Sequence, residues 1–271
     1  MPEEQKLQNI LVAVPTTGGM MKAKTAESLV NLMKFLTKSG INAHLHNINN
    51  SDIVTVRNIY ANMVFDSDRW DSLLFIDSDM SFTPRVISRM INLNEMVCAA
   101  ACTKRQIDLD KFAQAIRDHG DKDRAQAESV YFNTLLRWDN RRDIKVKQRG
   151  GFFTMAAIGM AVCLIRRSAL KLMVEQGAVE RRIDVYEGIT KKSWAFFDFL
   201  KYSGVTLTED YSFCHRWTHA MEQPLWVCAD EIVEHIGDFP YSANYSLALK
   251  KMLSAEPRSA GKRVTGHTPP E

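Results

Sequence analysis

Leu73-Leu74-Phe75-Ile76-Asp77-Ser78-Asp79 joins a short, continuous apolar run to two aspartates one residue apart. Such a run is typical of a central strand in a parallel sheet, because that strand is buried on both faces. Open α/β sheets bind their ligands beyond the carboxyl ends of the strands, where these aspartates are expected to lie. The stretch therefore predicts a ligand site at one edge of an α/β sheet.

The residues before this stretch alternate strand and helix patterns. Residues 9–14 and 41–45 have strand patterns, and the apolar positions of residues 29–36 between them recur at helical spacing. A second helix, which carries Arg57, is predicted to begin with a cap from one of the residues 51–52. Alternation of this kind indicates a doubly wound, mostly parallel sheet covered by helices.

The residues after this stretch divide into three parts. A further strand is predicted over residues 96–101, and the charge-rich residues 105–150 then predict a helical insertion or lid. The apolar run over residues 152–165 returns to the core. We therefore expect a single domain over residues 1–256, followed by a disordered tail over residues 257–271 that is rich in Ser, Gly, Lys and Pro.

The composition narrows the functional classes. The chain has 271 residues, of which 45% are hydrophobic and 25% are charged, as in ordinary globular proteins. Its net charge of +3 comes from 35 basic and 32 acidic residues that are mostly interspersed, which argues against a nucleic-acid partner. No transmembrane segment or signal peptide is predicted, and the five cysteines form no CxxC pair. We expect a cytoplasmic protein with reduced cysteines.

Four pairs of aspartates one residue apart occur in the chain, and their positions distinguish them. Asp77 and Asp79 follow an apolar strand, where paired carboxylates can hold Mg²⁺ or Mn²⁺ and, through the ion, a diphosphate. The alternative for this pair is a loop cap. Capping or loop roles are expected for the other three pairs, which are Asp66/Asp68, Asp108/Asp110 and Asp121/Asp123.

Two later features bear on the same chemistry. Glu209 and Asp210 precede a predicted helix over residues 211–220, where their charge suits the helix N-terminus, and capping alone explains them equally well. His235 follows the strand pattern of residues 225–228. A lone histidine is more often a surface residue than a metal ligand, so His235 gains weight only together with the two acidic pairs.

In this order, the motifs resemble those of GT-A glycosyltransferases with a DxD motif, in particular small bacterial and viral inverting enzymes. The resemblance covers roughly Ile10 to Gly237 and rests on Val56-Arg57-Asn58, Leu74 to Asp79, Gly159 to Arg167, Thr208 to Cys214 and His235-Ile236-Gly237. It implies the GT-A fold, a Rossmann-like, doubly wound, mostly parallel α/β sheet with a helical insertion. The chain has a single glycine in residues 159–161 and no QxxRW-like sequence, so processive polymerisation is not expected.

The resemblance also implies how a nucleotide-sugar donor is bound. The implied ligands of a Mn²⁺ or Mg²⁺ ion are Asp77, Asp79 and His235. The implied donor-binding residues are Pro15, Thr16 and Thr17 at the nucleotide base, Arg57 at the nucleotide or diphosphate, Asp77 at the ribose or the metal, and either Lys104 or Arg105 at the sugar phosphate.

The implied reaction is transfer of one sugar to an acceptor hydroxyl of a glycan or another molecule, with inversion. Asp210 is the implied general base, and Glu209 competes with it for that role. Two other functions stay open: a phosphatase of the haloacid-dehalogenase type, which places a DxD after its first strand, and a catalytically inactive nucleotide-sugar-binding protein. An acceptor platform or core packing would account for the aromatic residues Trp194, Phe196, Phe197 and Tyr202.

Overall fold

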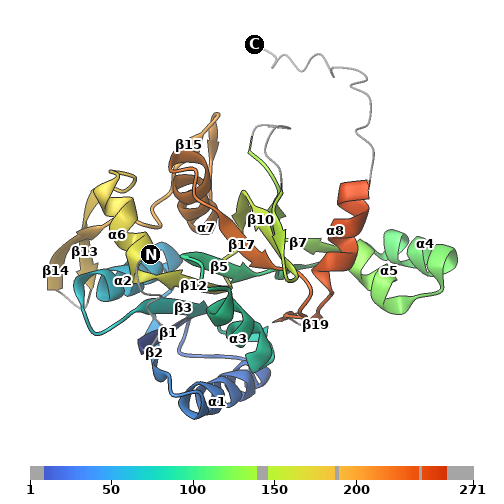
Figure 1. Cartoon of the computed structure of the whole chain (residues 1–271), viewed down its shortest axis with the longest axis horizontal. Coiled ribbons are helices and arrows are strands. Elements are labelled where there is room, and N and C mark those ends of the chain that lie inside the picture. The colour runs from blue at the N-terminus through green and yellow to red at the C-terminus, as the bar shows by residue number, and fades with distance from the viewer. Residues whose placement is uncertain (1–8, 139–145, 187–188, 238–239, 255–271) are drawn as a thin grey trace.

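The computed structural model describes residues 9–138, 146–186, 189–237 and 240–254, so the tail predicted over residues 257–271 lies outside them. The main sheet has eight strands in the order β2-β1-β3-β12-β5-β17-β10-β9. Six strands point the same way, and β12 and β10 run opposite to them. The predicted α/β fold with a mixed, mostly parallel sheet is confirmed (Figure 1). The strands of this sheet are β1 (Asn9–Thr16), β2 (Asn42–Asn49), β3 (Ser72–Ile76), β5 (Val97–Ala100), β9 (Gln148–Arg149), β10 (Phe152–Met155), β12 (Val162–Arg166) and β17 (Leu225–Cys228).

Helices cover both faces of the sheet because its strands are apolar on both sides. In β1, Ile10 and Val12 pack into one cluster with α1 (Ala23–Lys38) and α3 (Pro84–Leu93). Leu11 and Ala13 point the other way, into the cluster of α2 (Ile53–Asp66) and α6 (Arg167–Glu175). The two pairs of helices lie on opposite sides of the sheet, which makes the sheet doubly wound (Figure 1).

The start of α2 is fixed by a side-chain cap. The carboxylate of Asp52 accepts hydrogen bonds from the backbone N–H groups of Val54, at 3.0 Å, and Thr55, at 3.3 Å. These groups have no carbonyl partner inside the helix, so the cap satisfies them. Of the two predicted capping positions, Asp52 is therefore the one used.

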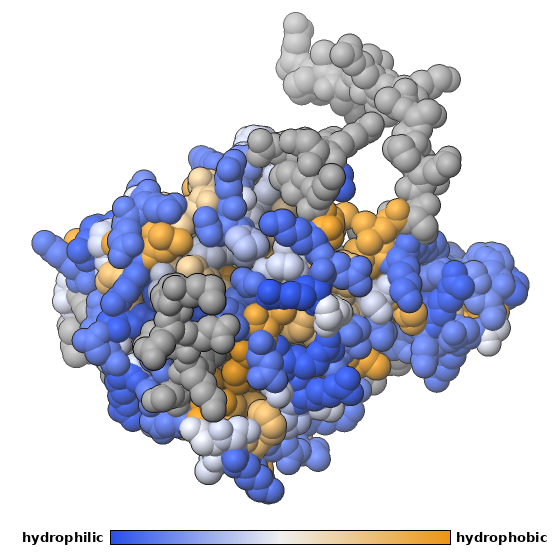
Figure 2. All heavy atoms as spheres, in the orientation of Figure 1, coloured by the Kyte–Doolittle hydropathy of each residue, from blue (hydrophilic) through white to orange (hydrophobic). Residues whose placement is uncertain are grey.

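The charged segment contains two helices followed by short strands. The helices are α4 (Leu109–His119) and α5 (Lys122–Ser129), capped by Asp108 and Asp121, which is the capping role expected for those pairs. Their surface is mainly hydrophilic (Figure 2). The two helices account for only part of the predicted insertion. They lie at one end of the molecule, beside α8 (Tyr245–Ser254) (Figure 1).

The helix predicted over residues 211–220 begins earlier and changes its winding. It consists of α7 (Glu209–Cys214), with Thr208 at the N-cap, and a π-helix over His215–Ala220. Glu209 and Asp210 therefore lie in the first helical turn and not before it, where acidic side chains favourably meet the helix dipole. The expectation that they precede the helix was wrong, because the helix begins two residues earlier than predicted.

Five small sheets complete the described structure. None of the described helices is long and apolar enough to span a membrane. The short strands are β4 (Met80–Ser81), β6 (Thr103–Ile107), β7 (Val130–Phe132), β8 (Thr134–Leu135), β11 (Ala157–Ile158), β13 (Arg181–Tyr186), β14 (Ile189–Trp194), β15 (Lys201–Tyr202), β16 (Val205–Thr206), β18 (Glu234–Ile236) and β19 (Pro240–Tyr241).

Candidate functional site

The strand order of the sheet reverses at β1. The chain passes from β1 to β2 on one side and then crosses back to β3 on the other side, so the carboxyl ends of β1 and β3 flank a topological switch point. A hollow of about 320 Å³ lies there. It is lined by Pro15, Thr16, Thr17, Asn50, Ser51, Ile53, Asp77, Ser78, Asp79 and Arg105.

A three-stranded sheet brings His235 to the second aspartate of the DxD. Strand β18 pairs with β4, which follows Asp79 directly, and the backbone N–H of Ile236 donates to the Asp79 carbonyl at 2.8 Å. The pairing places His235 Nε2 3.2 Å from Asp79 Oδ2, although 156 positions separate the two residues. The structure therefore joins two of the three implied metal ligands.

The hydrogen bonds of His235 define which ring nitrogen faces the site. Its Nδ1 lies 2.8 Å from the carbonyl oxygen of Thr103, and because a carbonyl only accepts, Nδ1 carries the hydrogen. In the neutral ring, the lone pair of Nε2 therefore points to Asp79. Burial lowers the pKa of His235, but the Asp79 carboxylate and the Thr103 carbonyl outweigh it and raise that pKa above its ordinary value.

Arg105 contacts the same two residues. Its Nε donates to His235 Nε2 at 3.1 Å, and its Nη2 forms an ion pair with Asp79 Oδ2. These neighbours lower the pKa of Asp79, although burial acts in the other direction. Lys104 and Arg105 are both exposed, but successive residues of a strand point to opposite faces. Of the two, Arg105 lines the hollow.

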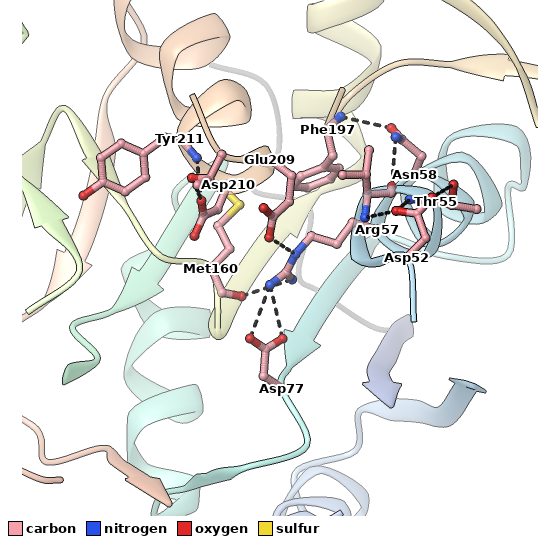
Figure 3. A network of polar contacts seen from close by, with 12 residues as sticks. Asp52, Thr55, Arg57, Asn58, Asp77, Met160, Phe197, Glu209, Asp210 and Tyr211 are labelled. Atoms are coloured by element: carbon pink, nitrogen blue, oxygen red, sulfur yellow. Dashed lines mark hydrogen bonds and ion pairs between the residues drawn. The ribbon is translucent and has the colours of Figure 1, made fainter. Parts of the chain in front are cut away.

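Asp77 faces a buried arginine instead of Asp79 and His235. The guanidinium of Arg57, which is 3% exposed, places Nη2 3.2 Å and 3.3 Å from the two oxygens of Asp77 (Figure 3). The same guanidinium reaches Glu209 Oε1 at 3.5 Å and the Met160 carbonyl at 3.4 Å. Arg57 thus links the DxD to the second acidic pair.

Burial distinguishes these acids from ordinary surface carboxylates. It raises the pKa of Asp77, and the nearby Asp79 adds to this effect, while Arg57 opposes it. Burial likewise raises the pKa of Glu209, with Asp210 adding to the shift and Arg57 opposing it. Clustered carboxylates with perturbed pKa values at a sheet edge are a common feature of functional sites.

Asp210 has different partners from Glu209. Its Oδ1 accepts from the backbone N–H of Tyr211 at 2.8 Å and from the Thr208 hydroxyl. Its Oδ2 accepts from Asn133 Nδ2 at 3.5 Å. Asp210 is therefore held by neutral donors, whereas Glu209 forms an ion pair with Arg57.

Asn133 was missed in the sequence, where nothing marks it within the charge-rich segment. Its approach to Asp210 explains why residue 159 is a glycine. A Cβ at Gly159 would lie 2.2 Å from Asn133 Nδ2, and the Gly159 N–H donates to the Asn133 carbonyl at 2.8 Å. Only the absence of a side chain at residue 159 lets Asn133 reach Asp210.

The aromatic residues considered for an acceptor platform have different environments. Phe196 and Phe197 are fully buried and belong to the hydrophobic core. Tyr202 is partly buried and meets the ring of His215 at 4.3 Å between centroids. Core packing therefore accounts for Phe196 and Phe197.

The donor set suits a divalent cation in part. No three Asp, Glu, His or Cys side chains within the described ranges lie close enough to hold a metal ion together. Asp79 and His235 nevertheless present a carboxylate oxygen, which suits Mn²⁺ and Mg²⁺, and an imidazole lone pair, which suits transition metals, 3.2 Å apart. The Thr103 carbonyl holds the imidazole in the orientation and tautomer that a metal ligand needs.

The comparisons with known proteins give distant structural likenesses only. No family model and no curated protein matches the chain. The crystal structure of the A197 protein from STIV has 13% sequence identity and a TM-score of 0.43, with 85% of this chain and 87% of that chain covered. The crystal structure of GalNAc-T7 with UDP, GalNAc and Mn²⁺ has 7% identity and a TM-score of 0.38, with 83% of this chain and 43% of that chain covered. At TM-scores below 0.5, these likenesses carry no functional conclusion.

Proposed function

We propose that this protein is a metal-dependent, non-processive glycosyltransferase that moves one sugar from a nucleotide-sugar donor to an acceptor hydroxyl of a glycan or another molecule, with inversion. One observation carries the proposal: two acidic pairs from distant parts of the chain converge at the switch point of an α/β sheet, linked by Arg57. The adjacent hollow of about 320 Å³ falls within the usual size range of small-molecule sites.

The donor would lie in this hollow. Pro15, Thr16 and Thr17 at the end of β1 would face its nucleotide. Asp79 and His235 would hold Mn²⁺ or Mg²⁺, with Asp77 positioned beside them by Arg57. When bound, such an ion offsets the negative charge of the leaving diphosphate.

Asp210 would take the proton of the acceptor hydroxyl. A general base needs a free lone pair in a fixed position, and the neutral donors around Asp210 fix its carboxylate without a cation partner. Glu209 is less suited because its carboxylate is paired with Arg57. An inverting transfer uses such a base on the face of the sugar opposite the leaving group.

The two other candidate functions have less support. A phosphatase of the haloacid-dehalogenase type would use the first aspartate of the DxD as its nucleophile, but here that aspartate is paired with a buried arginine and follows the third strand of the chain. A binding protein without activity would bind donor and release no product, so turnover separates it from an enzyme.

Metal-dependent nucleotide binding tests the proposed site. We expect calorimetry with Mn²⁺ and a panel of nucleoside diphosphates to show binding to the parent protein and at least tenfold weaker binding to Asp79→Ala and His235→Ala, since each loses a ligand. Asp110→Ala and Asp123→Ala remove aspartates of the two helix-capping pairs and should bind like the parent. Parental affinity in both site variants would show that the ion is not held there.

A further inference from the structure

Arg105 contacts the two ligand atoms that the proposed metal ion would need. Its guanidinium contacts both Asp79 Oδ2 and His235 Nε2, so the cation at this point of the structure is an arginine. The side chain of Arg105 is 50% exposed, whereas those of Asp79 and His235 are 17% and 21% exposed. Asp79 and His235 are thus mostly buried, whereas the guanidinium of Arg105 that pairs with them is accessible to solvent.

We propose that Arg105 is an exchangeable cation, which neutralises Asp79 before the metal binds, then yields Asp79 and His235 to the metal and moves to the donor diphosphate. The inference rests on the proposed function. A carboxylate oxygen and an imidazole lone pair 3.2 Å apart repel each other unless a hydrogen or a cation lies between them, and Arg105 and a metal ion cannot both occupy that place.

The geometry gives Arg105 a second place to bind. It lines the same hollow as Thr16, Thr17 and Asp77, so its guanidinium stays within the proposed donor site after it leaves Asp79. The side chain of Arg105 is 50% exposed, so its guanidinium can change position without entering the core. A guanidinium also matches phosphate oxygens with two parallel hydrogen bonds, which an ammonium group cannot do.

Exchange predicts opposite effects of one substitution on two ligands. Arg105→Gln removes the competitor of the metal, so Mn²⁺ alone should bind more tightly. It also removes a phosphate partner, so a nucleoside diphosphate should bind more weakly once Mn²⁺ is saturating. If Arg105 instead only held Asp79 and His235 in place, Arg105→Gln would weaken the binding of both Mn²⁺ and the nucleotide.

The test is calorimetry on the full chain with Mn²⁺ alone and then with UDP, GDP, ADP and CDP at saturating Mn²⁺. For Arg105→Gln we expect roughly twofold to fivefold tighter Mn²⁺ binding, as for loss of a competing solvent-accessible ion pair. We expect the nucleotide that the parent binds to be about tenfold weaker, as for loss of one charge-assisted hydrogen bond. Arg117→Gln, which removes an equal charge from the exposed face of α4, should change neither affinity.

Two results would overturn the inference: the first leaves the proposed function intact, and the second also removes its dependence on a metal. One is unchanged or weaker Mn²⁺ binding in an Arg105→Gln protein that unfolds at the parental temperature. The other is nucleotide binding by the parent that needs Arg105 and no metal, which would make Arg105 a permanent substitute for the ion. A parent that binds neither Mn²⁺ nor any of the four nucleotides would overturn the proposed function and the inference together.

Arg105→Lys separates charge from shape in the same titrations. It keeps a cation beside Asp79, so Mn²⁺ should bind with nearly parental affinity, but the nucleotide should bind more weakly because the paired hydrogen bonds are lost. Mn²⁺ binding in Arg105→Lys as tight as in Arg105→Gln would contradict competition between the two cations.

Discussion

At the scale of single residues, the site depends on a few buried polar contacts. A place for Arg57 near the nucleotide or diphosphate stays a prediction. In the structure its side chain is 3% exposed and joins Asp77 to Glu209. Its position on a helix was predictable from the pattern, whereas its partners were not, because they lie 20 and 152 positions away. Removing one partner of such a group leaves buried charges without compensation.

Arg57→Met should therefore lower the free energy of unfolding by about 3–5 kcal/mol at pH 7, measured by urea denaturation. Burial already raises the pKa of Glu209 above its reference of 4.5, and loss of Arg57 raises it further. A carboxyl whose pKa is raised by folding stabilises the folded state in its protonated form. This contribution to the free energy of unfolding is complete below the unfolded pKa and is lost as the pH rises through the folded pKa. The difference between variant and parent should shrink as the pH falls towards 4.5. A constant difference from pH 7 to pH 4 would argue against uncompensated carboxylates.

Asn133 and Gly159 should act as a unit. Gly159→Ala places a Cβ 2.2 Å from Asn133 Nδ2, so the amide must leave Asp210. We expect slower sugar transfer in Gly159→Ala and in Asn133→Ala, and no further loss in the double variant, since the same contact is already gone. Additive losses in rate would place the effect of Gly159 elsewhere.

At the scale of elements, the sequence pattern predicted those strands and helices that neighbouring residues determine. Strands such as β3 and the helix from residue 53 have clear apolar patterns or caps, so they were predictable. The antiparallel position of β12 between β3 and β5, and the pairing of β18 with β4, depend on contacts between distant residues. His235 was therefore identified by resemblance, while its place beside Asp79 needed the structure.

The cap of α2 gives a prediction at this scale. Asp52→Ala leaves the N–H groups of Val54 and Thr55 without a side-chain partner and should lower the free energy of unfolding by about 1 kcal/mol. Asp52→Asn keeps a capping oxygen, so its free energy of unfolding should fall by only a few tenths of the loss in Asp52→Ala. Thermal unfolding of the two variants measures the difference, and equal losses in both would assign the effect to the charge of Asp52 rather than to the cap.

At the scale of the whole molecule, the fold explains why residues from distant segments meet. The reversal of strand order at β1 opens the sheet edge, β3 and α7 each place an acidic pair there, and β18 adds His235. The helices α4 and α5 lie beside α8 at one end of the molecule (Figure 1). A role of the predicted insertion as a lid over the site stays a prediction.

Product release from a panel of nucleotide-sugars with Mn²⁺, with and without simple glycan acceptors, tests the central claim most directly. We predict that the parent releases nucleoside diphosphate from at least one donor and that Asp210→Asn binds that donor equally well but turns it over about 10²- to 10⁴-fold more slowly, as for loss of a general base. Glu209→Gln is the comparison that separates the two acids. A parent that binds a donor without releasing any product, or an Asp210→Asn variant with parental turnover, would contradict the account.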